Sequence, residues 1–206
     1  MRPQPFVVGL YSPRPQSGKS TTARAIAGEF VCDTFKISGA MKAMTAALLE
    51  SSGIPAADIP RYVDGDLKED PIPGLVCDDG RPLTSRDIQK TLGLEWGRTL
   101  FGGRFWTRPV AAEIATAPQP VAIVDDIRFE EDFDLVQSLG GINVRIDRAD
   151  GTLALDGHKS EGLLDGHAFD VMLANDGDLA TFEARIAADL LPRIAEGVAR
   201  QAKAHV

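Results

Sequence analysis

Cysteine is scarce in this chain: Cys32 and Cys77 are the only two, and they do not form a CxxC pair. This usage is typical of reduced thiols in a cytoplasmic protein. No apolar run is long enough to cross a bilayer, and the first residues lack the basic head and apolar core of a signal peptide. We therefore expect a cytoplasmic location and no membrane partner.

Positive charge is also in short supply. The chain has 22 Lys and Arg against 30 Asp and Glu, a net charge of −8. This balance argues against bulk nucleic-acid binding, which needs a basic surface. It does not exclude a small phosphorylated ligand, because a few focused cations can outweigh the global field. With 206 residues, 44% of them hydrophobic, the chain fits one domain with a real core. The oligomeric state stays open between monomer and homodimer.

The N-terminal region carries the most informative motif. The apolar run Phe6–Leu10 leads into a loop and then into Gly18-Lys19-Ser20-Thr21, which opens a helix-compatible stretch. This is the strand–loop–helix pattern of a phosphate-binding P-loop. The unpaired N–H groups and the positive dipole end of the helix suit a polyphosphate. Lys19 would reach the β- and γ-phosphates, and the Ser20 hydroxyl would ligate Mg²⁺.

The motif is incomplete, because Pro13 stands where the full pattern has its first Gly, and Pro15 adds a second residue without an N–H. Both prolines precede the turn that should hold the phosphates, so the donors from residues 16 to 21 all remain. The alternative is an ordinary helix N-terminus.

Apolar runs and breaker residues predict an α/β fold: a parallel sheet of about five strands flanked by helices. A capping box at Thr84–Asp87 predicts a helix that runs towards Leu94. The segment 54–83 is rich in Pro, Gly and Asp and is predicted to be irregular. We expect strands at 6–11, 34–37, 121–124, 142–146 and 169–173, and helices at 19–30, 40–51, 107–115 and 179–199.

Asp125-Asp126 ends an apolar strand downstream of the P-loop, where P-loop NTPases place a carboxylate that holds Mg²⁺. Arg128 would point the same way as Asp126 and could clamp a phosphate. The alternatives are a surface turn for the aspartates and, for Arg128, a salt bridge to Glu130, Glu131 or Asp132.

Residues 84–109 combine arginines with both tryptophans in an acidic protein. Cations for a phosphate and rings for a base suit a nucleoside monophosphate. The alternative places Trp96 and Trp106 in the core and the arginines on the surface. The arginines are Arg86, Arg98, Arg104 and Arg108.

Within this region, residues 89–98 (QKTLGLEWGR) resemble the "QTLGTEWGR" block of phage-type deoxynucleoside monophosphate kinases. Shorter matches follow in the family's order: 40–42 to "PLK", 126–129 to "DVRF", 158–161 to "HASE" and 175–177 to "NDG". The sequence departs from the family at Pro13, at Leu94 and at Lys159, and the last two leave the substrate preference open.

The resemblance implies transfer of the ATP γ-phosphate to a deoxynucleoside 5′-monophosphate, giving the diphosphate. The implied architecture is a single P-loop kinase domain: a core of 1–37 and 117–206, an inserted helical acceptor lobe at 38–116 and a lid at 147–167. The expected cofactors are ATP and Mg²⁺, and the expected partners are small nucleotides. Alternatives are a P-loop kinase for a modified nucleotide or a modified base in DNA, and a nucleotide-binding regulator without turnover.

The expected site residues fall into four groups. The catalytic group is Lys19, Arg128, Arg145 and Arg148. The ATP group is Arg14, Gln16, Ser17, Gly18, Lys19, Ser20, Thr21 and Asn175. The acceptor group is Lys42, Arg86, Gln89, Trp96, Arg98, Trp106 and Arg128. The metal group is Ser20 and Asp126.

Overall fold

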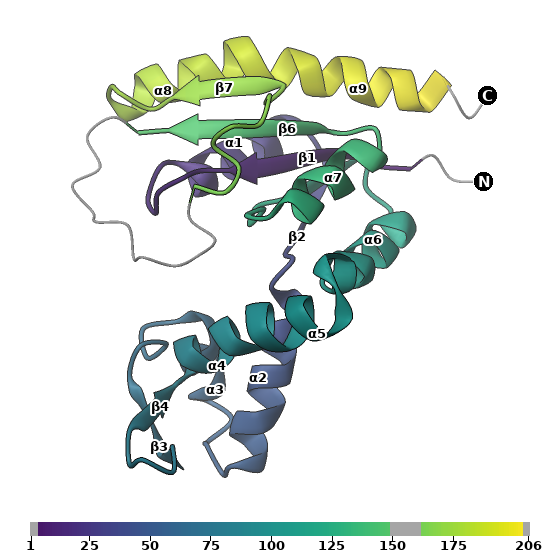
Figure 1. The fold of residues 1–206 in the computed structure, drawn as a ribbon. Coiled ribbons are helices and arrows are strands. Elements are labelled where there is room, and N and C mark those ends of the chain that lie inside the picture. The colour runs from purple at the N-terminus through teal and green to yellow at the C-terminus, as the bar shows by residue number, and fades with distance from the viewer. Residues whose placement is uncertain (1–3, 149–161, 204–206) are drawn as a thin grey trace. The chain divides into compact units, whose positions relative to one another are not determined.

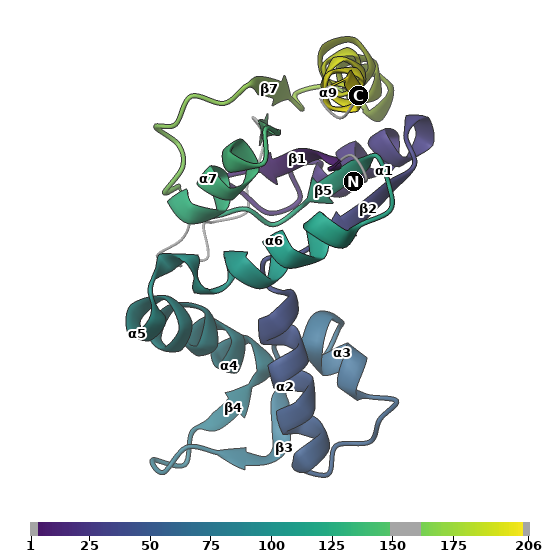
Figure 2. The ribbon, with the colours of Figure 1, turned by 90° about the vertical axis from the view of Figure 1, so that its right-hand side faces the viewer.

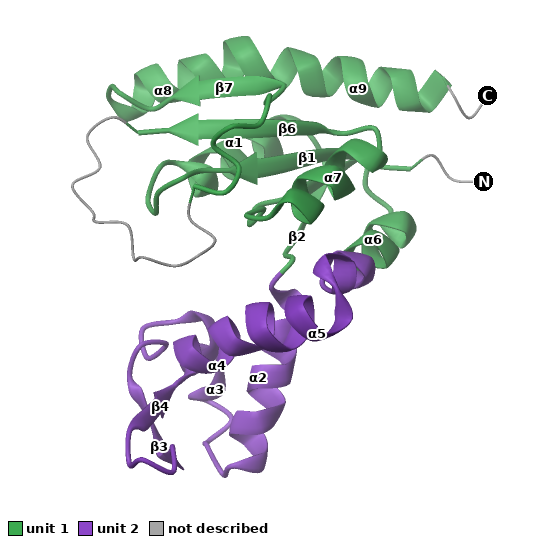
Figure 3. Ribbon diagram, in the orientation of Figure 1, with its two compact units in different colours: residues 1–37, 110–206 green, residues 38–109 purple. Residues whose placement is uncertain are grey.

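The computed structural model describes residues 4–148 and 162–203. The chain divides into two compact units, Met1–Ile37 with Val110–Val206 (unit 1) and Ser38–Pro109 (unit 2) (Figure 3). The division after Pro109 comes earlier than the expected boundary at 116. Val110 and Ile114 are buried and belong to unit 1, so the helix α6 (Thr107–Thr116) crosses the division.

Unit 1 is built on a parallel sheet. Among the described residues, five strands form this sheet in the order β2-β5-β1-β6-β7, and every neighbouring pair is parallel (Figure 1). The predicted parallel sheet flanked by helices is therefore confirmed. The elements are β1 (Phe6–Tyr11), α1 (Lys19–Glu29), β2 (Cys32–Phe35), β5 (Val121–Val124), α7 (Glu130–Ser138), β6 (Ile142–Asp147), β7 (Val171–Ala174), α8 (Leu179–Arg185), the π-helix η3 (Ile186–Leu190) and α9 (Leu191–Lys203).

Strand boundaries shift where pairing overrides the local pattern. Val121–Val124 is a strand as predicted, and its four residues are completely buried, as expected for a central strand. The strand expected at 34–37 lies at Cys32–Phe35, because these residues pair one to one with Val121–Val124. The strand expected at 169–173 begins later, at Val171, opposite Val144 of β6.

Two helical layers enclose the sheet (Figure 2). On one face, Ile26 of α1 and Phe182 of α8 share an apolar core with alternate strand residues such as Leu10. On the other face α7 packs so closely that a Cβ on Gly9 would lie 2.8 Å from Val136 Cγ2. This packing leaves the carboxyl ends of the parallel strands to form one edge, the usual position of ligand sites in such sheets.

Unit 2 contains more regular structure than its sequence predicts. The segment expected to be irregular holds a helix and an antiparallel strand pair, so that prediction is wrong. Burial is the reason, because Tyr62 and Ile72 join Leu49 in an apolar cluster. The elements are α2 (Gly39–Ser51), α3 (Ile59–Asp64), β3 (Pro71–Val76), β4 (Pro82–Thr84), α4 (Ser85–Thr91), the π-helix η1 (Leu92–Arg98), α5 (Thr99–Phe101) and the 3-10 helix η2 (Gly103–Phe105).

The predicted capping box is present at the start of α4. The Asp87 N–H donates to Thr84 Oγ1 at 3.1 Å, and the Thr84 N–H donates to Asp87 Oδ2 at 3.3 Å. The helix then changes to a π-helix at Leu92, within the block at 89–98. Within the two described ranges, no helix is both long and apolar enough to span a membrane.

Candidate phosphate-binding site

The P-loop motif forms a tight loop between β1 and α1. Gln16 (φ 56°) and Gly18 (φ 113°) both lie in the left-handed region of backbone conformation, which favours glycine. Gly18 is the N-cap of α1, and among the described residues no side chain caps this end. The N–H groups of the first turn therefore keep the unpaired donors and the positive dipole end that an anion requires.

Serine hydroxyls stabilise the part of the loop that contains the prolines. Ser12 Oγ and Ser17 Oγ both donate to the Arg14 carbonyl, at 2.8 and 2.6 Å. Lys19 Nζ in turn donates to Ser12 Oγ at 2.6 Å, so the lysine folds back over the loop. Ser17 is buried, whereas Gln16 and Ser20 are exposed.

Asp125 and Asp126 follow β5 and lie close to the loop. Asp126 Oδ1 accepts the Ile37 N–H at 2.7 Å, and Asp125 Oδ2 lies 3.6 Å from Lys36 Nζ. Burial lowers the pKa of Lys19, and the charge of Arg128 adds to this, whereas both aspartates oppose it. Lys19, Arg128 and the two carboxylates therefore interact electrostatically.

This donor set fits Mg²⁺. A serine hydroxyl and one or two carboxylates are hard oxygen ligands, and Mg²⁺ usually takes its remaining ligands from water and substrate phosphates. Among the described residues, no group of three or more His, Cys, Asp or Glu forms a complete cage. Ser20 and Asp126 are the residues that would hold the ion, with Asp125 as the neighbouring alternative.

Arg128 is oriented by the start of α7. Its backbone N–H and that of Phe129 each donate to Asp132 Oδ2 at 3.0 Å, and Asp132 is 1% exposed. The contact with Asp132 is thus made by the backbone, while the exposed side chain of Arg128 acts on Lys19. Sequence analysis missed this role of Asp132, although an acidic residue in the first turn of a helix is a recognisable capping signal.

Arg145 is held by acidic partners at the carboxyl end of β6. Its guanidinium lies 2.9 Å from Asp147 Oδ2 and 2.9 Å from Asp165 Oδ1. Asp165 also accepts the Tyr11 hydroxyl at 2.8 Å, and burial followed by this hydrogen bond raises the pKa of Tyr11. This network occupies Arg145, so its expected catalytic role would require a phosphate to displace a carboxylate. Sequence analysis did not anticipate Tyr11 or Asp165, because residues this far apart gave no local signal.

Two further predicted residues contact the loop backbone. Arg148 Nη1 donates to the Gln16 carbonyl at 3.2 Å, and Asn175 Nδ2 donates to the Ser17 carbonyl at 2.9 Å. The sequence motif at 158–161 and most of the expected lid at 147–167 lie outside the described residues.

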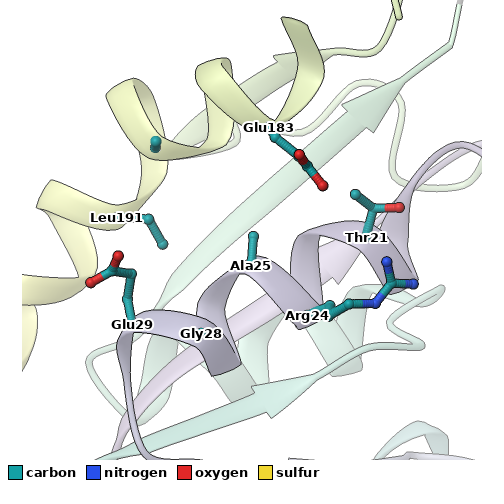
Figure 4. A pocket seen from close by; sticks show the side chains of 8 residues that line it. Thr21, Arg24, Ala25, Gly28, Glu29, Glu183 and Leu191 are labelled. Carbon is teal, nitrogen blue, oxygen red and sulfur yellow. The ribbon is translucent and has the colours of Figure 1, made fainter. Parts of the chain in front are cut away.

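A pocket of about 340 Å³ runs along α1 beside α8 and α9 (Figure 4). Thr21 marks the end that adjoins the phosphate loop, and Glu183 points from α8 towards α1. One arginine and two glutamates give the walls no excess of positive charge, so a phosphate would not favour this pocket over the loop. The lining residues are Thr21, Arg24, Ala25, Gly28, Glu29, Glu183, Ala187 and Leu191.

Unit 2 has its own cluster of charges. Lys42 Nζ lies 2.6 Å from Asp64, Lys68 Nζ lies 3.8 Å from Asp64, and Arg86 Nε lies 2.9 Å from Glu69. Burial lowers the pKa of Lys68; Asp64 opposes this shift, and Lys42 and Arg86 add to it. These three cations and the carboxylates of Asp64 and Glu69 therefore form one charged cluster. Lys68 was not among the expected acceptor residues.

The tryptophans of unit 2 have different surroundings. Trp106 is 1% exposed and donates its Nε1–H to the Gly93 carbonyl at 3.0 Å. A Cβ on Gly97 would lie 2.1 Å from Trp106 Nε1, so the ring packs directly on the π-helix. Trp106 is therefore a core residue in this conformation, as in the alternative interpretation of the sequence, and its contact with a base stays a prediction that this burial disfavours. Trp96 is only partly buried and packs edge-on against Phe101, which is 53% exposed.

The remaining acceptor residues also make structural contacts. Gln89 Nε2 donates to the Val63 carbonyl at 2.8 Å, which joins α4 to α3. Arg98 Nη1 donates to the Gly103 carbonyl at 2.8 Å, which closes the turn after α5. Arg86 and Arg98 belong to unit 2 and Arg128 to unit 1. Their expected convergence on one phosphate stays a prediction.

No family model matches the chain. No curated protein matches it either. Among solved structures, the crystal structure of TT1252 from Thermus thermophilus is 15% identical, with a TM-score of 0.46 over 90% of this chain and 96% of that chain. A likeness at this level carries no argument about function.

Proposed function

We propose that this protein transfers the γ-phosphate of ATP to a deoxynucleoside 5′-monophosphate. The observation that carries the proposal is the phosphate loop itself. It combines an uncapped helix N-terminus at Gly18 with a lysine that interacts with Arg128 and two aspartates. Phosphoryl transfer depends mainly on positioning and on neutralising charge, and this loop supplies cations and metal ligands for both tasks.

Lys19 would neutralise the transferring phosphate, and its lowered pKa favours this role. A partly buried ammonium gains from the arrival of an anion, because the anion offsets the cost of removing the charge from water. Arg128, whose charge acts on Lys19, would bind the phosphate of the acceptor or the transferred group. Mg²⁺, held by Ser20 and Asp126, would supply electrostatic stabilisation of the phosphates when bound.

We assign acceptor binding to unit 2. Its cluster brings three cations, Lys42, Lys68 and Arg86, close together, and cations suit a monophosphate. The partly exposed rings of Trp96 and Phe101 offer apolar surface to a base. The resemblance of residues 89–98 to a kinase block supports the same assignment. No general base is needed, because a monophosphate oxygen is already a competent nucleophile.

The test is ADP release from ATP and Mg²⁺ with a panel of deoxynucleoside monophosphates. We expect at least one of them to raise the rate well above the acceptor-free rate, and Lys19→Ala to abolish this increase in a folded protein. Lys203→Ala, an exposed lysine at the end of α9, is the matched control. If no monophosphate raises the rate, the proposal fails; turnover with DNA alone would indicate a polymer substrate instead.

A further inference from the structure

The phosphate loop is held from outside by the turn that follows β7. Asn175 Nδ2 donates to the Ser17 carbonyl at 2.9 Å, and Arg148 Nη1 donates to the Gln16 carbonyl at 3.2 Å. The backbone N–H of Asn175 donates to the Asp147 carbonyl at 2.7 Å, so the sheet fixes the position of Asn175. The carbonyls of two consecutive loop residues, Gln16 and Ser17, therefore accept hydrogen bonds from the residues that follow β6 and β7.

A hydrogen bond that fixes a backbone carbonyl also orients the N–H of the following residue. A peptide unit is planar and trans, so its N–H points opposite to its C=O. Because the Ser17 carbonyl points towards Asn175, the Gly18 N–H points away from Asn175. In the same way, the Gln16 carbonyl points towards Arg148, so the Ser17 N–H points away from Arg148. The left-handed conformation of Gln16 is unfavourable by itself and persists only when its surroundings enforce it.

The turn and α8 lie directly against the loop. A Cβ on Gly18 would lie 2.7 Å from Phe182 Cε1 and 3.0 Å from Asn175 Nδ2. Phe182 is buried in the core of unit 1, so the side of α8 that faces the loop is held in place. The loop thus cannot relax towards the turn, and the Asn175 amide fixes which way its peptide units face.

We propose that Asn175 is a positioning residue of the phosphate loop, which acts through the Ser17 peptide on the polyphosphate chain and does not contact adenine. This inference rests on the proposed function, because it requires that the loop binds a nucleoside triphosphate. It revises the expectation from sequence that Asn175 is a direct ATP ligand. It also explains how the loop would bind phosphates with Pro13 in place of the first Gly, since Arg148 and Asn175, which follow β6 and β7, hold the backbone.

The experiment compares Asn175→Ala with wild type in calorimetric titrations of three probes: a non-hydrolysable ATP analogue, the matching GTP analogue and inorganic tripolyphosphate, each with Mg²⁺. The matched control is Asp176→Asn, because the carboxylate of the adjacent Asp176 pairs with Arg185. Asn175→Ser is the second variant should the alanine variant unfold, and thermal unfolding establishes that each variant is folded.

We expect Asn175→Ala to weaken all three probes by the same factor, roughly five- to tenfold for one lost hydrogen bond. The ratio of ATP to GTP affinity should not change, and Asp176→Asn should bind like wild type. Weaker ATP binding with unchanged tripolyphosphate binding would show that Asn175 contacts the nucleoside, which overturns the inference, as would unchanged binding of all probes. If wild type binds none of them, the proposed function itself fails and the inference with it.

Discussion

Replacing Asp126 separates its structural contribution from its chemical one. Asp126 Oδ1 accepts the N–H of Ile37, which is 3% exposed. Asp126→Ala leaves this buried donor without its acceptor and should lower the free energy of unfolding by about 1.5–3 kcal/mol, the range for hydrogen bonds to charged groups. Asp126→Asn keeps a neutral acceptor oxygen in the same place, and we expect a loss of about 1 kcal/mol or less. Urea unfolding measures both.

Activity, unlike stability, should fall in both variants. Both variants lose the carboxylate, so both should need more Mg²⁺ and show a lower kcat, although only Asp126→Ala is strongly destabilised. The carboxylate also raises the pKa of Lys19, so its removal lowers that pKa further. Because charged Lys19 is the active form, the alkaline limb of the kcat–pH profile should move to lower pH.

The assay is the rate of ADP release as a function of Mg²⁺ and of pH. Asp125→Asn is the matched control for the Mg²⁺ dependence alone, because Asp125 also raises the pKa of Lys19. A normal Mg²⁺ requirement and an unshifted alkaline limb in Asp126→Asn would refute the assignment. If Asp125→Asn raises the Mg²⁺ requirement instead, then Asp125 is the residue nearer the metal.

Three further predictions follow from the same contacts. Gly18→Ala places a Cβ 2.7 Å from Phe182 Cε1 at a residue whose φ is 113°. We therefore expect the free energy of unfolding, measured in urea, to fall by about 1–3 kcal/mol and ATP binding to be lost. Normal ATP binding would contradict the loop geometry. Because burial lowers the pKa of Lys19, the folded protein binds fewer protons than the unfolded protein, and its free energy of unfolding rises with pH until Lys19 is deprotonated in both states. A bound triphosphate restores the charge of Lys19, so its binding should be coupled to proton uptake at alkaline pH. Calorimetry in buffers of different ionisation enthalpy should detect this uptake in wild type and not in Lys19→Ala. Trp96→Phe should abolish any fluorescence change on adding the monophosphate, because Trp106 is buried and hydrogen-bonded to Gly93. An undiminished change would have to come from Trp106 and would contradict the inference that Trp96 is the tryptophan next to the acceptor.

Local signals carried much of what the sequence predicted correctly. Val121–Val124 is a strand because four consecutive apolar residues need burial on both faces, and α4 begins at Ser85 because Thr84 and Asp87 cap each other. The predictions failed where they rested on residue composition alone and the tertiary contacts were unknown. Pro, Gly and Asp in the segment 54–83 gave the correct impression of turns, but burial of Tyr62 and Ile72 imposed a helix and a strand pair.

By itself the sequence determined the parallel sheet and the strand–loop–helix whose helix begins at Gly18 and Lys19, because these depend on short-range periodicity and on the conformational freedom of glycine. Only the tertiary structure decided what surrounds the loop. Asn175 and Ser17 are 158 positions apart, and Arg148 and Gln16 are 132 apart, so no local pattern could join them. The same holds for Trp106. A tryptophan can stack on a base or pack in a hydrophobic core, and only its burial against Gly97 assigns Trp106 to the core.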